Sequence, residues 1–127
     1  MIKEAYVSFE VAKLLKDKGF KEACHAMYNR NECLIPINFP RVTKSEKREF
    51  VLDAPTHQMA MKWLREEKNI SIVVDDDKIP LSYKYIIKKY SINDKSGVLI
   101  LKLDSLPFIK YEIAVEAAIK YSLENLI

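Results

Sequence analysis

Four side chains in this 127-residue chain are of the types that bind zinc: Cys24, His25, Cys33 and His57. Four ligands are enough for a tetrahedral site, but a zinc knuckle needs two cysteines only two to four residues apart. On a predicted hairpin Cys33 lies opposite Tyr28, about 13 Å along the strand from Cys24, which is too far for a shared ion or a disulfide. We therefore expect no metal site and two free, buried thiols.

A cysteine or serine beside a histidine can act as a nucleophile, so the same residues were weighed as catalytic pairs. No motif surrounds Cys24, Cys33 or His57, and the chain has only two glycines with which to build a tight turn for an oxyanion hole. His57 falls in the first turn of a predicted helix, where a positive imidazolium is disfavoured, and we expect it at the surface or at the boundary of the core. The sequence predicts no catalytic residue and no enzyme.

Three consecutive aspartates, Asp75, Asp76 and Asp77, are of the type that binds Mg²⁺. Consecutive residues cannot all converge on one ion without help from a turn, and a hydrophilic turn between two strands explains the same run. We interpret the aspartates as such a turn. The chain has no glycine-rich phosphate-binding loop, and we expect no cofactor.

Tyrosines and lysines are interleaved between residues 83 and 90, in a pattern that suits contact with nucleic acid. An exposed tyrosine face flanked by lysines can stack bases and hold phosphates, and the candidate contacts are Tyr83, Lys84, Tyr85, Lys88 and Lys89. The alternative is an ordinary strand whose tyrosines pack inward. We favour the second interpretation, with Tyr83 and Tyr85 mostly buried and Lys84 and Lys88 solvated.

Composition places the chain among ordinary globular proteins. Hydrophobic residues make up 49% and charged residues 31%, which excludes a wholly disordered chain. The formal net charge of +3, with the two signs interspersed, does not by itself indicate nucleic acid. No secretory signal and no apolar run long enough to span a membrane is visible, so we expect a cytoplasmic protein without membrane contact.

The first half of the chain predicts a helix, a hairpin and a long loop. Ser8 is a suitable N-cap and Gly19 a suitable stop for the helix. Residues 23–28 and 33–37 suit two strands around a turn at 29–32, with Pro36 indicating an edge strand. Residues 38–53 are expected to form a surface loop.

The second half predicts two helices around a three-stranded antiparallel meander. Pro55 suits the first turn of a helix that buries Trp63 and ends near Asn69. Strands follow at 70–74, 81–90 and 98–103, the last covered on both faces, and the final helix spans 111–126 with Ile113 on its inner side. The expected fold is a single α+β domain over residues 1–127, in the order α-ββ-α-βββ-α, with helices packed on an antiparallel sheet.

Three segments resemble a known family: residues 5–20, residues 54–66 and the ending 111–127. The chain resembles a family of small uncharacterised proteins found in gut-bacterial genomes, prophages and phages. The resemblance implies cytoplasmic expression and a role in a mobile element, and it brings no catalytic residues. The same segments consist of helix caps and core positions.

Two functional hypotheses follow. The first is a non-enzymatic protein-interaction or accessory module of a phage or mobile element, whose protein partner the sequence does not name. The alternative is a nucleic-acid-binding module that uses the Tyr/Lys strand 83–90. The sequence is also compatible with a homo-oligomer.

Overall fold

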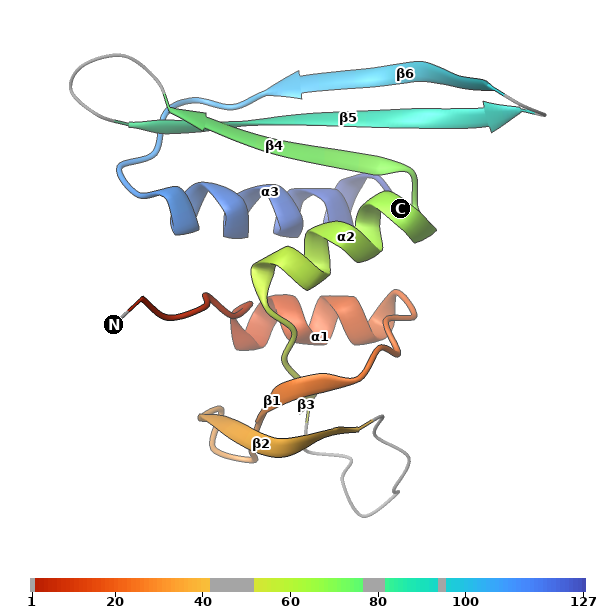
Figure 1. The fold of residues 1–127 in the computed structure, drawn as a ribbon. Helices are drawn as coiled ribbons and strands as arrows, with labels where there is room; N and C mark the ends of the chain where they lie inside the picture. The colour runs from red at the N-terminus through yellow and green to blue at the C-terminus, as the bar shows by residue number, and fades with distance from the viewer. Residues whose placement is uncertain (1, 42–51, 77–81, 94–95) are drawn as a thin grey trace. The chain divides into compact units, whose positions relative to one another are not determined.

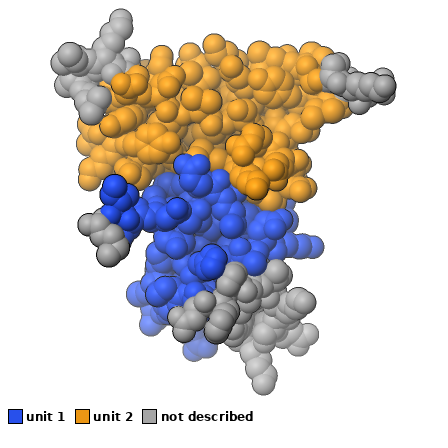
Figure 2. Space-filling model, viewed as in Figure 1, with its two compact units in different colours: residues 1–60 blue, residues 61–127 orange. Residues whose placement is uncertain are grey.

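The computed structural model describes residues 2–41, 52–76, 82–93 and 96–127. Three helices and two three-stranded antiparallel sheets make up this part of the chain, which confirms the predicted α+β class. The elements follow the predicted order with one further short strand, but they form two sheets instead of one. The chain divides into two compact units, residues 1–60 and 61–127 (Figure 2).

The first helix, α1 (Phe9–Asp17), has the two ends that the sequence predicts. The Ser8 hydroxyl accepts a hydrogen bond from the Val11 amide at 3.2 Å. Gly19 adopts φ +98°, and the amide of buried Phe20 donates to the Leu15 carbonyl at 2.9 Å. These contacts satisfy backbone groups that a helix end leaves unpaired.

The first sheet has the order β2-β1-β3 and lies in the first unit. β1 (Cys24–Tyr28) is central, β2 (Leu34–Arg41) is an edge strand that contains Pro36, and β3 (Leu52–Asp53) packs against α1. β2 and β3 both extend into the segment expected to be a loop, of which residues 42–51 lie outside the described residues. β1 pairs with β2 along one edge and with β3 along the other.

The β1–β2 turn is one residue longer than predicted. Tyr28 pairs with Leu34 and not with Cys33, because Asn29 organises the turn. Its side-chain oxygen accepts hydrogen bonds from the amides of Asn31 and Cys33, both at 2.9 Å. Glu32 takes φ +61°, and Cys33 is exposed, contrary to the expected buried thiol.

The second helix, α2 (His57–Glu67), begins two residues after Pro55 and does not include it. Thr56 caps it, since its hydroxyl accepts from the Met59 amide at 3.2 Å, and Pro55 therefore precedes the cap instead of lying in the first turn. Asn69 follows the helix and adopts φ +56°. This left-handed conformation is typical of a residue that ends a helix, as predicted for Asn69. Trp63 is buried as predicted, whereas His57 is also buried and not at the surface.

The second sheet is the predicted meander, with the order β4-β5-β6. β4 (Ile70–Asp76), β5 (Tyr83–Asn93) and β6 (Ser96–Asp104) are longer than expected at most of their ends. Asp75 and Asp76 pair with Lys84 and Tyr83, so these two aspartates belong to a strand and not to a turn. Asp77 lies outside the described residues.

The third helix, α3 (Tyr111–Asn125), packs against β4 and β5 and covers one face of the second sheet (Figure 1). Its larger buried residues include Val115, Ile119 and Leu123. Ile113, expected on the inner side, is exposed because the helix turns these residues toward the sheet instead. Among the described residues, no helix combines the length and the apolar character needed to cross a bilayer.

Candidate functional site

The five residues proposed for nucleic-acid contact are divided between the two faces of the second sheet. Successive side chains on a strand point to opposite faces. Tyr83, Tyr85 and Lys89 share the face that α3 covers, since Lys89 donates a hydrogen bond to the carbonyl of Leu126. Lys84 and Lys88 lie on the opposite face, which we call the open face.

The two tyrosines make ring contacts on the covered side of the sheet. Tyr83 meets Tyr111 of α3 edge to face, with ring centres 5.8 Å apart, and Tyr85 stacks on Phe108 at 6.0 Å. Burial raises the pKa of the Tyr85 hydroxyl, and the nearby Tyr121 adds to the rise. Both rings are therefore engaged with their own unit and do not form a platform for successive bases.

The lysines of the open face have contrasting cross-strand partners. Lys84 pairs with Asp75 of β4, whereas Lys88 pairs with Lys102 of β6. Lys84 and Lys88 are half-buried and not fully solvated, and Tyr83 and Tyr85 are likewise half-buried and not mostly buried. The tyrosines and the lysines lie on opposite faces of the strand, as predicted. They do not differ in burial, although the tyrosines were expected to be more buried than the lysines.

Tyr90 and Lys102 are open-face residues that the sequence hypothesis did not select. Tyr90 follows Lys88 by two residues and pairs with Leu99 of β6. Lys102 lies opposite Lys88, and only the register of β5 with β6 shows this pairing. The open face thus combines one half-buried aromatic ring with Lys84, Lys88 and Lys102.

The edge strand β6 carries three consecutive exposed apolar side chains. Val98, Leu99 and Ile100 are 52%, 48% and 57% exposed, and Ile92 of β5 beside them is 60% exposed. β6 was expected to be covered on both faces. It is not, because α3 packs over β4 and β5 and β6 is the outer strand.

A second exposed apolar group lies in the segment that follows β6. Leu106 is 84% and Ile109 80% exposed. The segment is held to β5 at two points: the Ser105 amide donates to the Tyr85 carbonyl at 3.0 Å, and Tyr83 and Phe108 exchange two backbone hydrogen bonds. The backbone on either side of Leu106 is therefore hydrogen-bonded to β5.

The thiols and imidazoles differ in their burial. Burial raises the pKa of the Cys24 thiol to about 12, and the carboxylates of Asp53 and Glu22 contribute. Cys33 is an exposed free thiol, His25 is exposed and His57 is buried. In the part of the chain that the structure describes, no three histidine, cysteine or acidic side chains are grouped so as to hold a metal ion.

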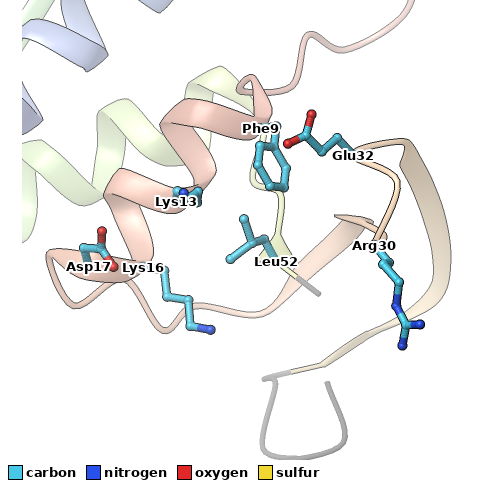
Figure 3. A pocket seen from close by; sticks show the side chains of 7 residues that line it. All are labelled: Phe9, Lys13, Lys16, Asp17, Arg30, Glu32 and Leu52. Atoms are coloured by element: carbon cyan, nitrogen blue, oxygen red, sulfur yellow. The ribbon is translucent and has the colours of Figure 1, made fainter. Parts of the chain in front are cut away.

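A small open pocket of about 290 Å³ lies in the first unit between α1 and the β1–β2 turn (Figure 3). Phe9 and Leu52 supply its apolar surface, and Lys16 and Arg30 extend on opposite sides of Leu52. The other lining residues are Lys13, Asp17 and Glu32. The volume is at the lower limit for ligand sites, about 300 Å³. The lining carries both signs of charge and contains no cysteine, serine, threonine or histidine.

Comparison with protein-family models, with curated proteins and with solved structures gives no match to this chain. The edge strand β6 and the adjoining open face are therefore selected as the candidate site from their physical properties.

Proposed function

We propose that the chain is a non-enzymatic protein-interaction module that binds an extended polypeptide along the edge of β6. The observation that carries this proposal is the exposure of three consecutive apolar residues, Val98, Leu99 and Ile100, on a strand that pairs on one side only among the described residues. Long apolar edge strands are templates for pairing with another chain, and soluble proteins usually blunt them with charges or proline. The apolar end of β6 carries neither.

Strand addition explains why the first half of β6 is apolar on both faces. An added strand makes main-chain hydrogen bonds along the edge, and its alternate side chains reach the two faces of the sheet. Val98 and Leu99 lie on opposite faces, so a partner strand covers both at once. The family resemblance supports an accessory role in a phage or other mobile element, and a cytoplasmic location stays a prediction.

Site-specific cross-linking tests the proposal. A photoreactive amino acid replaces Ile100 in the full chain, and a matched control carries it at Gln58, an exposed residue of α2. We expect a polypeptide adduct from position 100 that is lost when Val98→Asp is added, while the melting curve is unchanged. No adduct, or an equal adduct from position 58, contradicts the proposal.

A second candidate function, nucleic-acid binding, is favoured by the pairing of Lys88 with Lys102 on the open face. Two cations directly opposite one another repel, and a phosphate between them offsets that repulsion. Tyr90 supplies one ring on the same face, where the original hypothesis required Tyr83 and Tyr85.

A gel shift with single-stranded DNA or RNA at low salt tests this second candidate. Phosphate contacts make affinity fall steeply with salt concentration. We expect no sub-micromolar complex. A tight complex that dissolves with salt and is lost in Lys88→Glu would make nucleic-acid binding the preferred function.

A further inference from the structure

We infer that the strand bound at the β6 edge is β6 of a second copy of this chain, paired antiparallel with Leu103 on the two-fold axis. The inference rests on the proposed function and names its partner. Three features of residues 100–106 support it: the direction of the backbone groups, the order of the charges and the placement of the exposed apolar residues.

The backbone groups of Lys102 and Asp104 point away from β5. Ser105 donates its amide to Tyr85, so Ser105 belongs to a hydrogen-bonded pair of the β5–β6 ladder. Hydrogen-bonded pairs alternate with non-hydrogen-bonded pairs along an antiparallel ladder. The backbone of Leu103 therefore also forms hydrogen bonds with β5, whereas the backbones of Lys102 and Asp104 do not. In an antiparallel second copy centred on Leu103, the outward backbone groups of Lys102 meet those of Asp104 of the other copy. The two strands can therefore form hydrogen bonds at both positions.

The charges of the edge are self-complementary in this register. Pairing around Leu103 places Lys102 opposite Asp104 of the second copy, and Asp104 opposite Lys102 of that copy. Both side chains are exposed and both lie on the open face, opposite Lys88 and Ile86 of β5. Opposite charges in direct cross-strand positions attract, and the pairing gives Lys102 a carboxylate beside its like-charged neighbour Lys88.

The exposed apolar residues also lie symmetrically about Leu103. Ile100 precedes it by three residues and Leu106 follows it by three, and they are 57% and 84% exposed. β6 has a register shift between Leu99 and Leu101, so Ile100 is its extra residue, and Leu106 lies two residues beyond the end of the strand. An antiparallel copy centred on Leu103 brings Ile100 of one chain near Leu106 of the other, so that exposed apolar groups of the two chains cover one another. An interface of this kind is isologous, with the same surface contributed by both copies. A partner strand of another sequence could cover the apolar residues. It would not in general place opposite charges against both Lys102 and Asp104.

Charge reversal tests the register without removing an apolar side chain. The full-length wild type, Lys102→Asp, Asp104→Lys and the double variant are compared by sedimentation equilibrium over a range of concentrations. Each single variant places like charges opposite one another twice, and we expect it to raise the dimer dissociation constant about tenfold or more. The double variant exchanges the two charges and restores dimerisation at the wild-type net charge.

Mixing the two single variants supplies a second readout. One then has two acidic positions and the other two basic ones, so we expect a heterodimer where neither variant dimerises alone. A wild type that remains monomeric at millimolar concentration overturns the inference, as does a dimer that neither single variant weakens. If the chain is monomeric while position 100 still cross-links to another polypeptide, the proposed function stands and only the second copy is excluded.

Discussion

Lys88 and Lys102 lie directly opposite one another on β5 and β6, in the middle of the open face of the second sheet. Like charges at directly opposed strand positions are unfavourable, and the neighbouring pair of Lys84 with Asp75 shows the favourable arrangement in the same sheet. The pairing therefore costs stability within the chain. A surface that meets negative charge, whether a carboxylate of a second copy or a phosphate, offsets this cost.

Replacing Lys88 by glutamate should stabilise the protein. The change places a carboxylate opposite Lys102 and converts repulsion into attraction, which we expect to raise the free energy of unfolding by about 0.5–1 kcal/mol. Urea denaturation at low protein concentration measures the change. The matched control is Lys84→Glu, which places a carboxylate opposite Asp75 and should destabilise by a similar amount. Equal effects of the two variants would contradict the register.

Cys24 should make stability fall in alkaline solution. Its pKa rises from 9.0 to about 12 in the folded protein because of burial, with Asp53 and Glu22 adding to the rise. Above pH 9 the unfolded chain loses the thiol proton while the folded chain keeps it, so the free energy of unfolding decreases with pH. The contribution is fully present below pH 9 and is lost as the pH approaches 12.

The measurement for Cys24 is the difference between wild type and Cys24→Ala, because lysines and tyrosines also titrate in this range. We expect the wild type to lose more stability between pH 8 and pH 10 than the variant. In native buffer near pH 8, alkylation should label Cys33 rapidly and Cys24 only after denaturation. Equal labelling of both thiols in the folded protein would show that Cys24 is accessible.

Gly19→Ala should destabilise the protein through backbone strain alone. Gly19 has φ +98°, and nothing lies within 4 Å of the position that a Cβ would occupy. A left-handed conformation costs an L-residue about 1–2 kcal/mol, and we expect a loss of that size in chemical denaturation. Gly97→Ala is the control, since its nearest atom, on Tyr90, is at 3.9 Å and its φ is not positive. That variant should be neutral or slightly stabilising.

Trp63→Ala should be the most destabilising of these substitutions. The Trp63 side chain is only 6% exposed, and truncating a buried aromatic residue costs about 3–5 kcal/mol. Urea unfolding followed by circular dichroism measures the loss, because the variant has no tryptophan fluorescence. Lys62→Ala, at the exposed neighbouring position of α2, should change stability by less than about 0.5 kcal/mol. A melting temperature unchanged by Trp63→Ala would contradict the burial of the ring.

The stops of the first two helices and the start of α1 could be predicted because their signals are local. Ser8, Gly19 and Asn69 act on backbone groups within a few residues of themselves, so the sequence places them correctly. Pro55 was placed in the first turn of α2, whereas it precedes the cap, because the Thr56 hydroxyl supplies an equally good cap. Asn29 lengthened the β1–β2 turn in the same way, through side-chain bonds that compete with the ladder.

The candidate site could be predicted only in part. Alternation alone separates Lys84 and Lys88 from Tyr83 and Tyr85, and the structure confirms that separation. Alternation does not say which face a helix covers. The burial of His57 was missed because its position in the first helical turn says nothing of what packs around it.

By itself, the sequence determined the α+β class, the element order and the β4-β5-β6 meander, because periodicity and turn residues act over short stretches of chain. Only the tertiary structure decided that the strands form two sheets, that α3 covers β4 and β5, and that β6 is left as an apolar edge. These outcomes depend on pairing between residues far apart in the chain, where the same apolar strand can be central or at an edge.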